Sequence, residues 1–160
     1  MTTPTVKLLC LDDDEHSLQA LRRVLRNEAW SSDFFSSPHE AIKALDQQHY
    51  DVIISDYRMP AINGIQFLEY AKLRAPLAQR IILSAGFDAS ALTAAVNRAE
   101  VYRVITKPWD NQDLLLTVQR AVAKAQSAVM ANPPRGSDEL LQVEFDRDGS
   151  IVLDDNGDNE

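Results

Sequence analysis

The sequence has little cysteine and no long apolar run, and these two features exclude several classes of protein. Cys10 is the single cysteine in 160 residues, so no internal disulfide can form. It lies within an apolar segment, which favours a buried position and a reducing compartment. No apolar run approaches the ~20 residues that a membrane helix needs, and the N-terminus lacks the pattern of a signal peptide. We therefore expect a cytoplasmic protein that does not enter a membrane.

Basic charge is also scarce, and its distribution argues against nucleic-acid binding. The net charge is −8. Residues 1–132 carry 14 basic and 15 acidic side chains, whereas residues 133–160 carry 2 basic and 9 acidic ones. Without a basic stripe to displace counterions, direct nucleic-acid binding is not expected. The three histidines lack the spacing of zinc ligands, so no zinc site is predicted.

Residues 6–131 alternate short apolar runs with segments of helical periodicity. The run Val52–Ile54 is apolar throughout, as expected for a parallel strand that is buried on both faces. The second strand, around Ser32–Ser36, has the weakest pattern. Five βα units with short connections predict an α/β fold with a doubly wound, five-stranded parallel sheet. The predicted strand order is 2-1-3-4-5, as in flavodoxin-like folds.

The composition changes after the last predicted helix. Two consecutive prolines end that helix. Apolar and polar residues then alternate from Leu141 to Phe145, and the turn residues Asp148–Gly149 follow, which predicts a β-hairpin. The predicted organisation is a phosphoacceptor domain at 1–131, a linker at 132–138, a β-hairpin extension at 139–153 and a disordered acidic tail at 154–160.

Four of the predicted strands end in polar residues that suit phosphoryl transfer. The carboxyl ends of parallel strands meet at one edge of a sheet, where open α/β folds bind ligands. We therefore expect these residues to lie together. They are Asp12–Asp13–Asp14 after Lys7–Leu11, Asp56 after Val52–Ser55, Ser84 after Arg80–Leu83 and Lys107 after Tyr102–Thr106.

The residue types at these strand ends predict a specific chemistry. Converging carboxylates of Asp12, Asp13 and Asp56 would raise one another's pKa unless a cation neutralised them. Mg²⁺ prefers such a site, with a few carboxylates plus water and phosphate oxygens. Asp56 is the best candidate nucleophile, because an aspartate can form an acyl phosphate. Lys107 can contact the phosphoryl oxygens as a point charge, and Ser84 can donate a hydrogen bond to them.

Several segments together match the motifs of one family. They are Lys7–Asp14, Asp51–Pro60 with Asn63–Gly64, Ile82–Gly86 and Ile105–Trp109. Through them, residues 6–126, about three quarters of the chain, resemble the receiver domain of bacterial two-component response regulators.

The resemblance implies a role for each residue of the predicted site. Asp56 would accept a phosphoryl group from a sensor histidine kinase or a phosphotransfer protein. Asp12, Asp13 and the backbone carbonyl of Arg58 would bind Mg²⁺ together with Asp56. Ser84 would be the switch hydroxyl, and Lys107 would pair with the phosphoryl group. The resemblance also implies that the Lys107–Pro108 bond is often cis.

The resemblance further implies a signalling module and not an enzyme that acts on other substrates. The protein would catalyse only its own phosphorylation and dephosphorylation and would signal to an output partner or domain of unknown identity. A homodimer is one expected form. Asp56–Pro60 and Lys107–Trp109 resemble receivers that are fused to cyclic-di-GMP phosphodiesterase or similar output domains, and none is expected within these 160 residues.

Position 104 departs from the family pattern, and the side chain of Arg58 has two possible arrangements. The family commonly has an aromatic switch residue three positions before the lysine, where this chain has Val104. Tyr102 is expected to share the strand face of Val104 by alternation, so it is a candidate substitute. The side chain of Arg58 is expected either to lean over the phosphoryl group and shield it from water or to point into solvent.

Two alternative functions remain open from the sequence. A haloacid-dehalogenase-like phosphatase would also use a strand-ending pair, here Asp12 and Asp14, with Mg²⁺. It needs further acids after the lysine strand, where Asp110 and Asp113 fit a helix start better, and it leaves Asp56 without a role. A degenerate receiver that acts only as an interaction module is the second alternative. The presence of every expected site residue argues against it.

Overall fold

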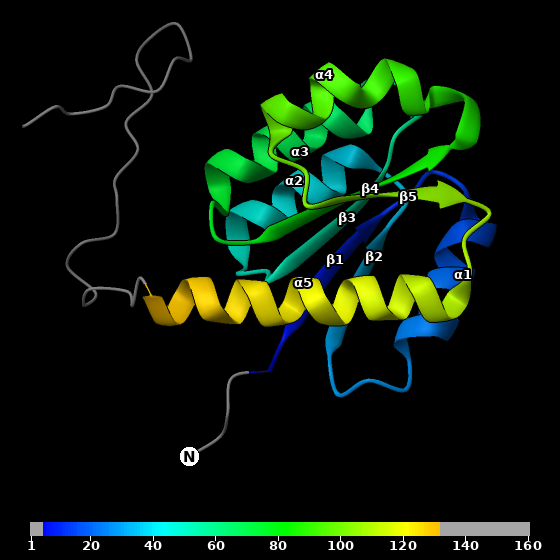
Figure 1. Cartoon of the computed structure of the whole chain (residues 1–160). Coiled ribbons are helices and arrows are strands. Elements are labelled where there is room, and N and C mark those ends of the chain that lie inside the picture. Colours follow the sequence, from blue (N-terminus) through cyan, green and yellow to red (C-terminus); the bar gives the residue numbers. More distant parts are fainter. Residues whose placement is uncertain (1–4, 132–160) are drawn as a thin grey trace, which may run out of the picture.

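A five-stranded parallel sheet forms the centre of the computed structural model, which describes residues 5–131 (Figure 1). The strand order is β2-β1-β3-β4-β5, which confirms the predicted fold class. The predicted linker, hairpin and acidic tail lie outside the described residues. The strands are β1 (Lys7–Leu11), β2 (Ser31–Phe35), β3 (Val52–Asp56), β4 (Gln79–Ala85) and β5 (Arg103–Lys107).

Helices cover both faces of the sheet. In Figure 1, α1 and α5 lie on one face, and α2, α3 and α4 lie on the other. Within residues 5–131, no helix is both long enough and apolar enough to cross a membrane. The helices are α1 (Glu15–Leu25), α2 (Pro38–Gln47), α3 (Gly64–Arg74), α4 (Ala89–Ala99) and α5 (Asn111–Ala131), and a short 3₁₀ helix, η1 (Gly86–Asp88), precedes α4.

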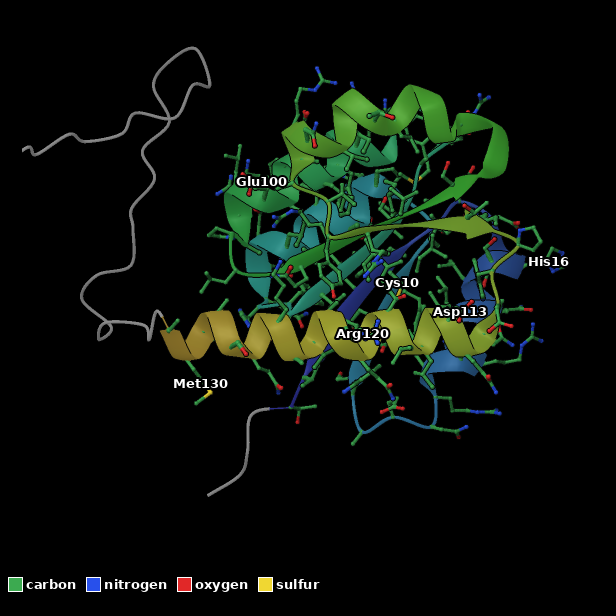
Figure 2. All side chains as sticks on the ribbon, in the orientation of Figure 1. Cys10, His16, Glu100, Asp113, Arg120 and Met130 are labelled. Carbon is green, nitrogen blue, oxygen red and sulfur yellow. The ribbon has the colours of Figure 1, made fainter. Side chains whose placement is uncertain are left out.

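The core has two halves, one on each side of the sheet, because successive strand residues point to opposite faces. Leu9 and Ile53 pack toward α2, α3 and α4, whereas Cys10 and Ile54 pack toward α1 and α5. Cys10 is fully buried, as predicted, and this burial raises the pKa of its thiol. Figure 2 shows Cys10 near the middle of the sheet.

The strands extend further toward the site than the sequence predicted. Asp56, Ser84 and Lys107 were expected to follow their strands, but all three belong to them. The ladder continues through these residues, since Asp56 pairs with Leu83 and Ser84 pairs with Thr106. The site residues are therefore held by the hydrogen bonds of the sheet.

The prediction that Tyr102 shares a strand face with Val104 is wrong. Val104 packs with the core half under α2, α3 and α4. Tyr102 packs with the other half, and its ring lies 5.1 Å from the ammonium nitrogen of Lys124 on α5. Tyr102 precedes the first residue of β5, so the alternation of the strand does not extend to it. It does not take the place of an aromatic residue at position 104.

A buried arginine holds the C-terminal end of α4. The Nε of Arg80 donates to the carbonyl of Ala99 at 2.9 Å, and its Nη2 donates to the carbonyl of Glu100 at 3.3 Å. Its Nη1 donates to the carbonyl of Ala78 at 2.8 Å. The carbonyls of Ala99 and Glu100 lie at the helix end, where carbonyl groups have no partner within the helix. A cation there satisfies them and complements the helix dipole.

Candidate phosphoryl-transfer site

Three carboxylates converge at the carboxyl edge of the sheet. Asp12 follows β1 and Asp56 ends β3, and these two strands are neighbours. Asp12 and Asp56 are buried, whereas Asp13 is exposed. One oxygen from each of the three carboxylates lies within 4.8 Å of the others. The predicted carboxylate cluster is therefore formed, and its oxygens are the donors that a hard divalent cation prefers.

Local hydrogen bonds explain why Asp12 and Asp14 have different roles. The backbone N–H of Asp14 donates to Oδ1 of Asp12 at 2.9 Å. The side chain of Asp14 in turn caps α1, since it accepts a hydrogen bond from the N–H of His16 at 3.0 Å. Asp14 is used to start a helix and does not join the carboxylate cluster. The phosphatase alternative requires Asp14 as a second catalytic acid, so this arrangement argues against it.

Asp110 is a helix cap as well. Its side chain accepts a hydrogen bond from the N–H of Asp113 at 3.0 Å, at the start of α5. Both acids were expected at the start of a helix, and this expectation is confirmed. Figure 2 shows Asp113 and His16 at the same end of the molecule, where β5 leads into α5, and Glu100 and Met130 at the opposite end.

Lys107 connects the two buried carboxylates. Its Nζ lies 2.8 Å from Oδ2 of Asp12 and 3.0 Å from Oδ1 of Asp56. Burial opposes the charged form of Lys107, but the hydrogen bonds to these two carboxylates outweigh burial and raise its pKa. The Lys107–Pro108 bond is cis, as the resemblance implies.

Ser17 is a further residue of the site that was not expected from the sequence. Its Oγ lies 3.4 Å from Nζ of Lys107 and donates to Oδ2 of Asp14 at 3.3 Å. Ser17 is in the first turn of α1, three residues after the cap, and this spacing was the only signal in the sequence. Ser17 thus links the start of α1 to the ammonium group of the site.

The environment of Asp56 raises the pKa of its carboxyl group. Burial raises its pKa, and the charges of Asp12 and Asp13 raise it further, while Lys107 lowers it. The net result is a pKa of about 6. A carboxylate that is poorly solvated and crowded by like charges is stabilised in its charged form by a nearby cation.

Ser84 lies on the strand next to Asp56, close to the end of β4. Its hydroxyl donates to the carbonyl of Ala85 at 3.0 Å. In this structure the hydroxyl is therefore bonded to its own strand. A short rotation would be needed before it could donate to a group on Asp56.

The side chain of Arg58 is mostly exposed, as in one of the two expected arrangements, but it also has a partner that was not expected. Its guanidinium forms an ion pair with Asp88, with an Nη2–Oδ1 distance of 2.8 Å. Sequence reasoning did not identify Asp88, an acid four residues after Ser84. The backbone of Arg58 lies two residues past Asp56, and its carbonyl remains a predicted Mg²⁺ ligand.

A close approach at Gly64 fixes the loop between β3 and α3. A Cβ atom on Gly64 would collide with the carbonyl oxygen of Asp56 and would lie 2.7 Å from Cδ1 of Ile82. The N–H of Gly64 donates to the carbonyl of Tyr57 at 2.7 Å. Asn63 caps α3 in a reciprocal pair of hydrogen bonds with Gln66. Only glycine allows the start of α3 to pack this closely behind Asp56.

The comparisons with known proteins agree with this geometry. The model of the response regulator receiver domain family matches residues 8–119. The chain is 38% identical over 122 residues to the hydrogenase transcriptional regulatory protein HoxA of Cupriavidus necator, which covers 76% of this chain and 25% of HoxA. It is 32% identical over 116 residues to the DNA-binding transcriptional regulator NtrC of Klebsiella pneumoniae, covering 72% of this chain and 24% of NtrC.

Solved structures show the same relationship. The signal receiver domain of an HD domain-containing protein from Pseudomonas fluorescens Pf-5 superposes with a TM-score of 0.74 at 29% identity, covering 79% of this chain and 93% of that one. The chain spans about a quarter of the length of the curated relatives that it matches. The matched family model and the identity to HoxA show that this chain belongs to the response regulator receiver domain family.

Proposed function

We propose that Asp56 accepts a phosphoryl group from a sensor histidine kinase or a histidine phosphotransfer protein and that Mg²⁺ is required. The position of Lys107 carries the proposal. Its ammonium group contacts the carboxylate of Asp56 at 3.0 Å, beside the carboxylates of Asp12 and Asp13. A phosphoryl group on Asp56 would thus arrive next to a fixed cation.

The donor set supports Mg²⁺ as the cofactor. Oxygens of Asp12, Asp13 and Asp56 can approach a single ion, and Mg²⁺ normally keeps several waters beside one or two carboxylates. The carbonyl of Arg58 is proposed as a further ligand. A bound Mg²⁺ would supply positive charge that neutralises the carboxylates and the incoming phosphoryl oxygens.

The reaction uses Asp56 as the nucleophile. One of its carboxylate oxygens attacks the phosphorus of a phosphohistidine, forming a P–O bond while the P–N bond breaks and the imidazole leaves with that electron pair. Lys107 keeps its proton and stabilises the negative oxygens of the transferred group. Water later attacks the phosphorus and regenerates Asp56. The protein thereby catalyses its own phosphorylation and dephosphorylation.

The phosphorylated state is proposed to act through Ser84. A phosphoryl oxygen next to β4 offers the hydroxyl of Ser84 a charged acceptor in place of the carbonyl of Ala85, which it contacts at 3.0 Å. Hydrogen bonds to charged acceptors are stronger than those to neutral ones, so the loop after β4 would rearrange. The names of HoxA and NtrC describe transcriptional regulators. We propose an output domain or partner protein of the cytoplasm, reached without direct DNA contact by the residues described.

Phosphopeptide mapping tests the proposal. The full chain is treated with acetyl phosphate and Mg²⁺, and we expect one added phosphate on the peptide that contains Asp56. Asp56→Asn should abolish it, while Asp14→Asn, which keeps an oxygen to cap α1 and lies outside the carboxylate cluster, should leave it in place. Equal labelling of the Asp56→Asn variant would overturn the assignment. Labelling of Asp12 would instead support the phosphatase.

A further inference from the structure

A two-pronged ion pair joins the loop after β3 to the loop after β4. The Nε of Arg58 lies 3.0 Å from Oδ2 and 3.2 Å from Oδ1 of Asp88, and Nη2 lies 2.8 Å from Oδ1. Two nitrogens of one guanidinium thus face one carboxylate, the geometry in which arginine pairs are strongest. The side chain of Asp88 is only 5% exposed, whereas that of Arg58 is 68% exposed.

The two partners belong to the segments that carry the phosphoacceptor and the switch hydroxyl. Arg58 follows Asp56 by two residues, and Asp88 follows Ser84 by four. Asp88 ends η1 and immediately precedes α4. The ion pair is therefore a bridge from the phosphorylation site to the start of α4.

Asp88 also stands where a helix cap is expected. It occupies the N-cap position of α4, yet its carboxylate makes no capping hydrogen bond. Aspartate is among the preferred N-cap residues, and its charge complements the positive end of a helix dipole. Asp88 has the backbone of a right-handed helix, since η1 runs directly into α4, and its carboxylate pairs with Arg58. A change of the Asp88 backbone to the extended conformation of an N-cap would let the same carboxylate turn to the first turn of α4.

We propose that the Arg58–Asp88 ion pair is a latch that holds the start of α4 in the unphosphorylated arrangement. Phosphorylation of Asp56 opens the latch because the new phosphoryl oxygens draw the Arg58 guanidinium away and leave Asp88 to cap α4. The inference rests on the proposed phosphorylation of Asp56.

The charges support this exchange. A phosphoryl group adds up to two negative charges and three strong acceptor oxygens, and a guanidinium binds phosphate with the same fork of donors that it offers to a carboxylate. Arg58 is mostly exposed, so it can move without disturbing the core. Asp88 is buried and would be costly to leave unpaired, but its N-cap position offers the start of α4 as a replacement partner.

The latch has a measurable consequence for ligand affinity. The ion pair is made only in the unphosphorylated state. Molecules in which it is closed do not bind a phosphoryl analogue well, so the apparent affinity falls in proportion to the fraction of molecules in which it is open. Breaking the latch should therefore raise the affinity for the analogue. By the same coupling, binding of the analogue should open the latch.

The test titrates the full chain with beryllofluoride in excess Mg²⁺ and follows amide NMR signals of residues 84–92. Asp88→Asn removes the charge that binds Arg58 and keeps an N-cap side chain, so its affinity for beryllofluoride should rise 5- to 20-fold. Arg58→Gln loses the latch and also the contact with the bound analogue, so its affinity should lie at least fivefold below that of Asp88→Asn. In the double variant the gain from Asp88→Asn should disappear.

Asp46→Asn is the matched control, because it breaks an ion pair with Arg74 that lies between α2 and α3. Its affinity should equal that of the unaltered protein. An affinity of Asp88→Asn within twofold of the unaltered protein, or below it, would overturn the latch. So would an equal gain from Asp88→Asn in the presence and absence of Arg58.

The substitution of Arg58 changes an exposed side chain and keeps the test valid even if Asp88→Asn unfolds. In that case Arg58→Lys, which cannot form the two-pronged pair, should bind more tightly than the unaltered protein, and equal or weaker binding overturns the latch. Absence of beryllofluoride binding by every protein, including the unaltered one, would overturn the proposed phosphorylation site itself and the latch with it.

Discussion

Lys107 lies within 2.8 Å of the fully buried carboxylate of Asp12, at the point where β1 and β5 direct their ends toward each other from either side of β3 and β4. This ion pair joins strands that do not pair with each other. It therefore contributes to stability as well as to chemistry, and it can be tested without any phosphodonor.

Replacement of Lys107 by methionine should destabilise the protein in the absence of divalent cations. Two buried carboxylates, those of Asp12 and Asp56, would lose their shared cation, and we expect a loss of roughly 1–3 kcal/mol in the free energy of unfolding at pH 7.5. Urea unfolding in EDTA measures the change. Lys43→Met, at an exposed position of α2, is the control and should have little effect. Equal losses in the two variants would contradict the role of Lys107.

Addition of Mg²⁺ should stabilise the folded chain by mass action. At a concentration of tenfold the dissociation constant, the gain is about 1.4 kcal/mol. Asp13→Asn should reduce the gain, because an exposed ligand is lost while the core is unchanged. Thermal unfolding with and without Mg²⁺ checks this, with Glu15→Gln, an exposed acid of the first turn of α1, as the control. If Glu15→Gln loses the Mg²⁺ effect equally, general acidity and not the predicted ligand set is responsible.

The stability contributed by residue 56 should depend on pH. Without a cation, the pKa of Asp56 is raised from an ordinary 3.8 to about 6 by burial and by the neighbouring carboxylates. A raised pKa means that the folded state favours the protonated acid, so the stabilising contribution is complete below about pH 4 and is lost as the pH rises through about 6. Asp56→Asn, which stays neutral, should therefore be more stable than the unaltered protein at pH 8, by about 1–3 kcal/mol.

The same variant should show no advantage at pH 4. Urea unfolding in EDTA at both pH values gives the comparison. Glu69→Gln, which removes an acid that pairs with Arg98 on the surface, serves as the control and should show no such pH dependence. An advantage of Asp56→Asn that is the same at pH 4 and pH 8 would show that charge is not its cause.

Replacement of Gly64 by alanine should destabilise the protein, whereas the same replacement at Gly86 should be tolerated. The added Cβ of Gly64→Ala would overlap the carbonyl oxygen of Asp56 and press on Ile82, so we expect a loss of at least about 2 kcal/mol and slower labelling of Asp56. At Gly86 the nearest atom is Cγ2 of Thr106 at 3.6 Å, an ordinary contact. Denaturant unfolding and acetyl phosphate labelling of both variants decide the question. Similar losses at the two positions would refute the close approach.

The sequence predicted the parts of the site that depend on strand ends alone. Asp12, Asp56 and Lys107 each stand at the end of an apolar run, and parallel strands bring such ends together whatever the details of packing. The fold followed from the same alternation of apolar runs and helical segments. Both predictions rest on patterns within short segments of the sequence. The order of the strands in the sheet then brings those segments together.

The parts that the sequence missed depend on contacts between segments that share no pattern. Nothing in the neighbourhood of Arg58 indicates that its guanidinium would find Asp88, thirty residues later. Arg80 was treated as the first residue of a strand, although its side chain binds the carbonyls at the end of α4. Tyr102 was assigned to a strand face one residue before the strand begins. In each case the outcome depends on loop geometry, which local sequence does not determine.

The buried guanidinium of Arg80 fixes α4 at its C-terminal end only. Its C-terminal end is anchored to β4 through the buried carbonyl of Ala99 and the partly buried carbonyl of Glu100, whereas the residue preceding its first turn is held by an ion pair with a mostly exposed arginine. Such a helix can change its slope at one end without sliding along the sheet. We therefore expect a partner protein that distinguishes the two states to touch the first turn of α4. A partner that binds near Ala99 would be indifferent to phosphorylation.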